Sequence, residues 1–188
     1  MIIEKHLLIT DSDLSLLQTL KNELELTSIQ IKQAIQKGCL WLQVDHKIKR
    51  LRRLKTTLKV GQQLHFYYNK QLLDQKPLIP EVIEDNHAYS IWFKPAGMLC
   101  QGSRWSDHTT IYRYAEQHLS PERQAIIVHR LDKMTSGLLI LAHQRKIAAA
   151  FTQIFEQRTI KKSYRTIVHG IFAEAETELI INSPLNGK

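Results

Sequence analysis

Leucines recur every three or four positions near the start of the chain, over residues 14–25. This spacing places them on one face of a helix and predicts an amphipathic helix. The leucines concerned are Leu14, Leu17, Leu20 and Leu24. Thr27, followed three residues later by Gln30, forms a capping-box pattern that predicts the start of a second helix. Gly38 is expected to end this helix, because glycine readily adopts the left-handed conformation found just past helix ends.

Alternation of apolar and polar residues replaces the helical spacing after Gly38. Residues 41–44 and 63–68 alternate as strands do, and a turn is expected after the first of them. We therefore predict a small N-terminal domain, residues 1–68, made of two helices and a strand hairpin. Residues 69–80 are polar and contain two prolines, which disfavour regular structure, so we interpret them as a linker.

A second domain is expected over residues 81–188. Its clearest feature is a pair of apolar runs, 126–128 and 137–142, which predict two buried strands. Between these runs lies a loop of charged and hydroxyl residues. The one carboxylate of this loop, Asp132, lies between Arg130 and Lys133.

Asp132 is the candidate for chemistry in this loop. Neighbouring cations favour the ionised form of a carboxyl group, while burial opposes it. An ionised carboxylate in a dry cleft can act as a nucleophile or a base. From the residues alone, a structural ion pair at a turn is the more frequent explanation of such a cluster. A kinase catalytic loop is excluded, because no glycine-rich phosphate loop precedes it and no suitably placed asparagine follows it.

Charge is unevenly distributed along the chain. The formal net charge is +8, and residues 1–80 alone hold 13 Lys/Arg against 7 Asp/Glu. A basic N-terminal part indicates a polyanionic partner, most simply nucleic acid, although solvated lysines would give the same composition. No apolar run is long enough to cross a membrane. Two distant cysteines and nine histidines show no metal-ligand spacing, so we expect a reducing cytoplasm and no metal.

Three motifs occur in an order that resembles the RluA-type RNA pseudouridine synthases. The sharpest is His129-Arg130-Leu131-Asp132, followed by Thr135-Ser136-Gly137-Leu138-Leu139. Lys-Pro-Ala-Gly at 94–97 is similar to an upstream motif of that family. Residues 151–170 resemble its next segment, a helix followed by a strand that carries Lys162-Ser163-Tyr164. The resemblance covers about residues 81–188.

The resemblance implies isomerisation of uridine to pseudouridine in ribosomal or transfer RNA, without a cofactor. It makes Asp132 the essential aspartate, which either attacks the ribose or removes a proton to give a glycal. Arg130 would help to fill the space left by the flipped uridine, and Tyr164 would pack against its uracil. His129 and Thr135 would shape the loop.

The N-terminal pattern resembles a small RNA-binding domain found in a ribosomal small-subunit protein and in many RNA-modifying enzymes. In that family the second helix and the adjoining loop face RNA phosphates. Such contacts give affinity with strong salt dependence and little sequence information. The candidate residues here are Lys32, Lys37, Lys47, Lys49, Arg50, Arg52 and Arg53.

The expected fold is α+β, with the small RNA-binding domain joined to an incomplete mixed-sheet catalytic domain. The family carries a later motif with an arginine that pairs with the aspartate, and we find no such motif in this sequence. Residues 180–188 resemble a mid-domain segment. We therefore expect a catalytic sheet that lacks strands and needs a missing C-terminal segment or a second chain. A non-catalytic RNA-binding protein is the alternative. A carboxylate-dependent hydrolase is weaker, because such enzymes usually need two placed carboxylates.

Overall fold

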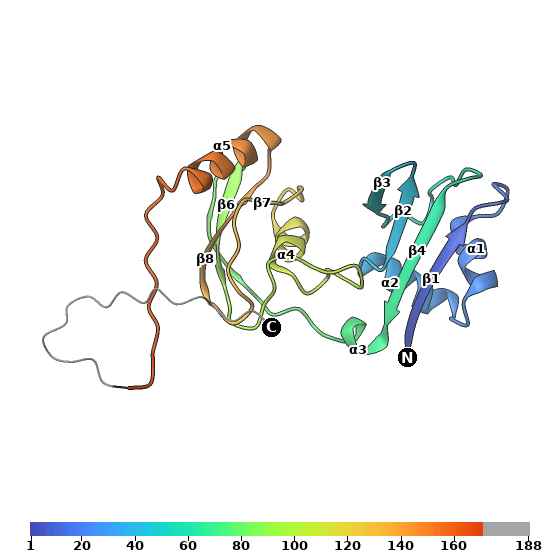
Figure 1. Cartoon of the computed structure of the whole chain (residues 1–188), viewed down its shortest axis with the longest axis horizontal. Coiled ribbons are helices and arrows are strands. Elements are labelled where there is room, and N and C mark those ends of the chain that lie inside the picture. The colour runs from blue at the N-terminus through green and yellow to red at the C-terminus, as the bar shows by residue number, and fades with distance from the viewer. Residues whose placement is uncertain (171–188) are drawn as a thin grey trace, which may run out of the picture.

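The computed structural model describes residues 1–170, which form two four-stranded sheets with accompanying helices. In the N-terminal unit the strand order is β1-β4-β2-β3. Its elements are β1 (Ile2–Leu8), α1 (Leu16–Glu23), α2 (Ser28–Gln36), β2 (Leu40–Val44), β3 (Lys47–Arg50) and β4 (Gln63–Asn69). Figure 1 shows this unit beside the second sheet, with the helix α4 on the side of that sheet facing the N-terminal unit.

Both N-terminal helices begin at capping boxes. At α2 the Thr27 hydroxyl accepts from the Gln30 backbone N–H, and the Gln30 side chain accepts from the Thr27 backbone, which confirms the predicted start. Ser15 and Gln18 make the same pair of contacts at α1. The first helix therefore begins two residues later than the leucine spacing predicted, because Ser15 takes the extended cap conformation.

The N-terminal core lies between the two helices and one face of the sheet. The other face carries half-buried Trp41, His65 and Tyr67. The strand β1, which the sequence did not predict, pairs along its whole length with β4, from Ile2 opposite Asn69 to Leu8 opposite Gln63. The largest fully buried side chains of this core are Phe66, Ile9, Leu16, Leu20, Ile31, Ile35, Leu40, Leu58 and Leu64.

The expected linker begins with a short helix, α3 (Lys70–Leu73), rather than with irregular chain. The Asn69 side chain caps it by accepting from the Leu72 backbone N–H, at 3.2 Å. Leu73 is buried in the N-terminal core. Residues 74–80 then connect to the second unit.

The second unit has the strand order β5-β6-β8-β7. Its elements are β5 (Glu81–Asp85), β6 (Tyr89–Lys94), α4 (Ile111–His118), β7 (Ile126–Ile127), β8 (Gly137–Ala142) and α5 (Arg145–Glu156). We expected a mixed sheet, but within residues 1–170 every pair of its strands is antiparallel. The short connections between β5 and β6 and between β7 and β8 account for two of the three pairs, since parallel neighbours need long crossovers.

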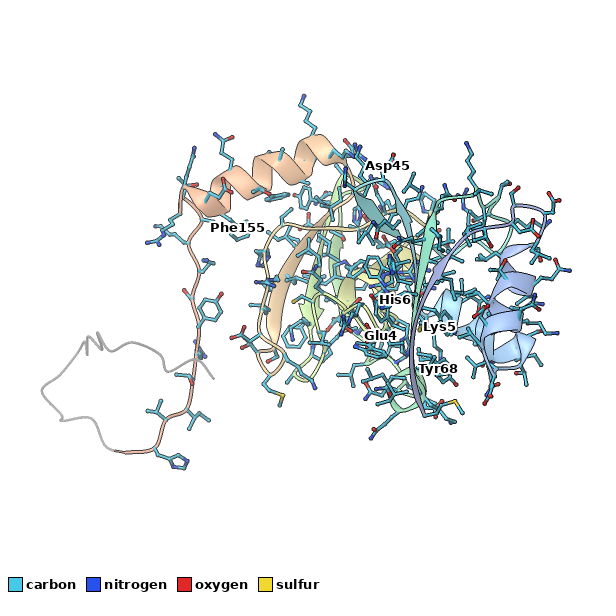
Figure 2. The ribbon with its side chains drawn as sticks, turned by 45° about the vertical axis from the view of Figure 1, so that its right-hand side comes forward. Glu4, Lys5, His6, Asp45, Tyr68 and Phe155 are labelled. Carbon is cyan, nitrogen blue, oxygen red and sulfur yellow. The ribbon has the colours of Figure 1, made fainter. Side chains whose placement is uncertain are left out.

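The two faces of the second sheet differ in how they are covered. α4 packs on the face that carries Trp92, Leu139 and Leu141. On the opposite face Phe93 and Leu138 are 41% and 61% exposed. α5 lies against one end of the sheet, where the Phe151 ring meets Tyr89 at 5.3 Å between centroids. Figure 2 labels Phe155 near the C-terminal end of α5.

Residues 160–170 were expected to contain a strand at Lys162-Ser163-Tyr164. The structure shows no strand there, so this expectation is wrong for the described chain. A strand needs a hydrogen-bonding neighbour, and none of the strands within residues 1–170 pairs with this segment. The expectations about residues 180–188 lie outside the described residues. No helix within residues 1–170 is long and apolar enough to cross a membrane.

Candidate active site

The polar loop predicted between two strands connects β7 to β8, and Asp132 lies in it as an exposed side chain. The Thr135 backbone N–H donates to the Asp132 carbonyl at 3.1 Å, which closes a turn. Gly137 follows with a φ of 135°, a left-handed conformation that L side chains rarely adopt. The loop thus presents the Asp132 carboxylate at its surface.

A buried lysine joins the Lys-Pro-Ala-Gly turn to this loop. The Lys94 ammonium has no exposed surface and donates to the carbonyls of Met98 (2.8 Å), Pro95 (3.2 Å) and Lys133 (3.2 Å). The Gly97 backbone N–H donates to the same Lys133 carbonyl at 2.7 Å. Burial lowers the pKa of Lys94, and the charges of Cys100 and Asp132 partly offset this effect. The residue next to Asp132 is therefore held by two donors.

Cys100 anchors the loop on the other side of Asp132. Its thiol donates to the Leu131 carbonyl at 3.2 Å, and the Leu131 backbone N–H donates back to the sulfur at 3.4 Å. Both neighbours of Asp132 in the chain are thus fixed to the segment 94–100. A fixed backbone on each side limits the positions that the carboxylate can take.

His129 supports the base of the loop. Its Nε2 atom accepts a hydrogen bond from the Ile140 backbone N–H at 2.9 Å. The imidazole stacks on Phe155 with 4.4 Å between ring centroids. Burial, together with the smaller effect of the Lys162 charge, lowers the pKa of His129 to about 4. At neutral pH this histidine is therefore uncharged, as its acceptor role requires.

Three of the predicted site residues line one cavity of about 700 Å³: His129, Thr135 and Tyr164. Tyr164 is 65% exposed in it. Phe155 and Lys162 also line this cavity. The loop carrying Asp132 borders the cavity through Leu131, Met134, Thr135 and Ser136.

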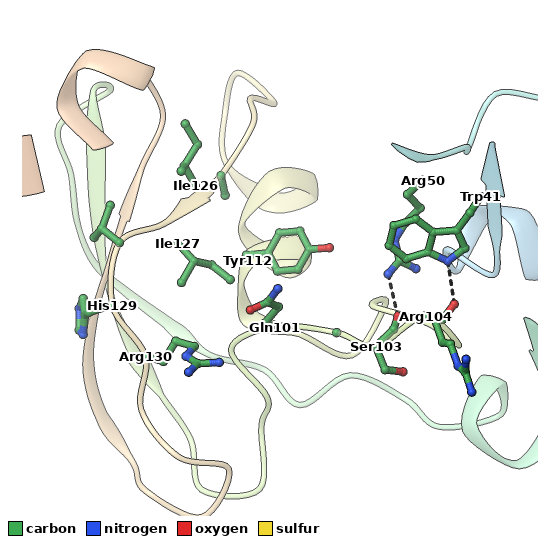
Figure 3. Close-up of a pocket in the computed structure, with 13 residues that line it drawn as sticks. Trp41, Arg50, Gln101, Ser103, Arg104, Tyr112, Ile126, Ile127, His129 and Arg130 are labelled. Atoms are coloured by element: carbon green, nitrogen blue, oxygen red, sulfur yellow. Dashed lines mark hydrogen bonds between the residues drawn. The ribbon is translucent and has the colours of Figure 1, made fainter. Parts of the chain in front are cut away.

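Arg130 lies on a second cavity of about 730 Å³, which opens between the two units (Figure 3). The walls of this cavity are joined by the segment 101–110. The Trp41 indole N–H donates to the Arg104 carbonyl at 2.9 Å, and the Arg50 guanidinium donates to the Ser103 carbonyl at 2.7 Å.

Asp107 forms the centre of this contact between the units. It is completely buried, and its carboxylate pairs with Arg50 at 3.3 Å and with Arg52. The Tyr112 hydroxyl donates to the same carboxylate. Burial raises the pKa of the Tyr112 phenol, and the Asp107 charge adds to that effect. The pairing of one carboxylate with two guanidinium groups offsets the cost of burying the charge.

The seven basic residues predicted to bind RNA fall into two groups. Arg50 and Arg52 pair with Asp107, and the Lys37 ammonium donates to the Leu73 carbonyl. The four that are exposed are Lys32, Lys47, Lys49 and Arg53.

Lys94, Cys100 and Asp107 were not predicted from the sequence as individual site residues. The alternation of residues along β6 could have indicated that Lys94 is buried, because Ser90, Trp92 and Lys94 share the buried face of this strand. Asp107 had no local signal, since its two arginine partners, Arg50 and Arg52, are more than fifty residues away. Among the described residues no group of three or more His, Cys, Asp or Glu could hold a metal ion.

Comparison with known proteins identifies the family. The tRNA pseudouridine synthase C of Haemophilus ducreyi is 38% identical over 43% of this chain and 33% of its own length. The ribosomal large subunit pseudouridine synthase D of Nitrosomonas europaea is 33% identical over 55% of this chain and 30% of its own. The dual-specificity RNA pseudouridine synthase RluA of Vibrio parahaemolyticus is 34% identical over 52% of this chain and 38% of its own length.

The matched part of the chain corresponds to about a third of the length of these relatives. A profile of the RNA pseudouridylate synthase family matches residues 88–188, which include the loop with Asp132, the Lys-Pro-Ala-Gly turn and Tyr164. Because this match spans more than half of the chain, the chain belongs to the RNA pseudouridylate synthase family.

Proposed function

We propose that this protein isomerises uridine to pseudouridine in RNA, with Asp132 as the catalytic carboxylate. The observation that carries the proposal is the convergence of two family motifs on one loop. Lys94 and Gly97 of the first motif both donate to the carbonyl of Lys133, which follows Asp132. Family membership supports the same chemistry.

The reaction breaks the bond between the ribose and the base nitrogen and forms a bond to a ring carbon. The hydrogen of that carbon ends on the nitrogen, so the reaction needs no oxidant, reductant or outside nucleophile. Asp132 either attacks the ribose or removes one of its protons, and both routes need an ionised carboxylate.

A uridine in folded RNA must leave its stack to reach Asp132, which costs a few kcal/mol. We assign Arg130 to the space that the base vacates and Tyr164 to stacking on the flipped uracil. Such stacking contributes about 1–3 kcal/mol and could offset much of the cost. His129 and Thr135 shape the loop, and they share the cavity of Tyr164.

The substrate class that we propose is transfer or ribosomal RNA, the classes named for the relatives. Phosphates would meet exposed cations of the N-terminal unit, which we propose as an RNA-binding domain. Lys32, Lys47, Lys49 and Arg53 are exposed there. Such RNA substrates and the two free, buried cysteines fit a cytoplasmic location.

A further segment or a second chain is proposed to complete the catalytic sheet. Phe93 and Leu138 pair across β6 and β8 and expose much of their surface on one face. Apolar surface of this kind is normally covered in a folded enzyme. A completing element on this face would also enclose the cavity that Tyr164 lines.

Pseudouridine formation tests the proposal directly. RNA from cells lacking modification enzymes is incubated with the wild-type chain, with Asp132→Asn and with the matched control Asp13→Asn. Product is expected from wild type and control and none from Asp132→Asn, whose RNA affinity should stay unchanged. Turnover by Asp132→Asn would exclude the assigned role. A folded wild-type chain that binds RNA without product would indicate either a binding protein or a chain that is inactive without the further segment proposed above.

A further inference from the structure

The cavity between the two units is built from both of them. Trp41 and Arg50 come from the N-terminal sheet, whereas Tyr112, Ile127 and Arg130 come from the second unit. In Figure 3 these two sets face each other across the space. At about 730 Å³ the cavity falls within the range of small-molecule sites.

Specific contacts hold the walls of this cavity in place. The buried Asp107 carboxylate binds Arg50, Arg52 and the Tyr112 hydroxyl, and so joins a strand of one unit to a helix of the other. The Cys39 thiol donates to the Trp105 carbonyl at 3.0 Å. Together with the two contacts drawn in Figure 3, these bonds fix the spacing of the walls.

The lining of the cavity suits an anion that carries a flat apolar ring. None of its thirteen lining residues, all within the described chain, is acidic. The Arg50 guanidinium is occupied by Asp107, Ser103 and Gly38, and Arg104 pairs with Glu4 at 3.6 Å. Exposed Arg130 is therefore the arginine of this cavity that can receive a phosphate. Rings line both walls, and Gln101 offers an amide that can read a base edge.

We propose that this cavity binds an RNA nucleotide next to the target uridine. Its base would lie between the rings of Trp41 and Tyr112. Its phosphate would meet the same Arg130 guanidinium that fills the vacated space, because this nucleotide neighbours the target uridine. Arg130 and Asp132 are two residues apart in one loop, so a nucleotide held by the first is adjacent to one held at the second. This inference rests on the proposed function and adds a source of sequence preference to it.

A matched pair of charge variants tests whether the nucleotide binds in this cavity. Gln101→Glu places a carboxylate inside the cavity, and Gln117→Glu makes the same change on an exposed position of α4. Binding of a short fluorescein-labelled oligouridylate is measured by anisotropy at low salt. We expect the dissociation constant to rise about tenfold for Gln101→Glu only. Equal effects of the two variants would overturn the proposal.

Photo-cross-linking provides an independent readout in the unaltered chain. An oligouridylate carrying 5-iodouridine should cross-link to Trp41 or Tyr112. Cross-links confined to aromatic residues outside the cavity, such as Tyr164, would overturn the proposal and leave the activity of Asp132 standing. A chain that does not bind the oligouridylate but forms product on cellular RNA would overturn the cavity proposal and leave the proposed function standing.

Discussion

Two side chains show how single residues stabilise the loop that carries Asp132. Lys94 is a charged group with no exposed surface, and three carbonyls receive its ammonium. A buried charge is retained only when it is paired or fully hydrogen-bonded, so this lysine ties the loop to the turn at 95–98. His129 acts at the other end of the loop as a neutral acceptor. The site therefore depends on one group staying charged and another staying neutral.

The lowered pKa of His129 predicts acid destabilisation. Its folded pKa, about 4, lies below the ordinary value of 6.5, so between these values the unfolded chain binds a proton that the folded chain does not. The free energy of unfolding should thus fall as pH drops from 7 to 5, with about 1 kcal/mol due to His129 after allowance for partial exposure. Urea unfolding at both pH values should show a smaller fall for His129→Gln. His46→Gln, on the exposed turn, is the control, and an unchanged fall in His129→Gln would contradict this assignment.

Secondary structure elements were predictable where the signal was local. The capping box at Thr27 fixed the start of α2, and apolar runs identified β8. The strand β1 was missed because its partner β4 lies about sixty residues away. The polar segment 101–110 carried no periodic signal, yet it joins the two units through Asp107. The loop of Asp132 was predictable from its motif, whereas its anchors required the folded chain.

The segment 101–110, which joins the two units through Asp107, makes a testable contribution to the free energy of unfolding. Asp107→Asn keeps the size of the side chain but leaves Arg50 and Arg52 without their carboxylate. Breaking a buried pair of this kind should lower the free energy of unfolding by about 3 kcal/mol, measured in urea. Asp13→Asn, an exposed change of the same type, should leave it unchanged. Equal stability of Asp107→Asn and the wild type would show that the contact does not stabilise the fold.

On the scale of the whole molecule, the basic N-terminal unit and the second unit are joined by the ion pairs of Asp107. Arg50 and Arg52 belong to the seven basic residues predicted to bind RNA, but their charge is used at this contact. The exposed cations of β3, Lys47 and Lys49, are therefore the better candidates for phosphate contacts. The sequence alone does not show which of these basic residues pair with Asp107 and which remain exposed for RNA.

The salt dependence of RNA binding distinguishes basic residues that contact RNA phosphates from those that join the two units. Each phosphate contact to single-stranded RNA adds about 0.7 to the slope of log affinity against log salt, so Lys47→Gln with Lys49→Gln should make the slope shallower by about 1.4. The matched control is Arg145→Gln with Lys146→Gln at the start of α5, which removes the same charge from the other unit. A slope that changes equally in both double variants would mean that net charge, rather than the β3 surface, attracts the RNA. A slope altered only by the β3 pair would place the phosphate backbone across the N-terminal sheet, with the loop of Asp132 in the adjoining unit.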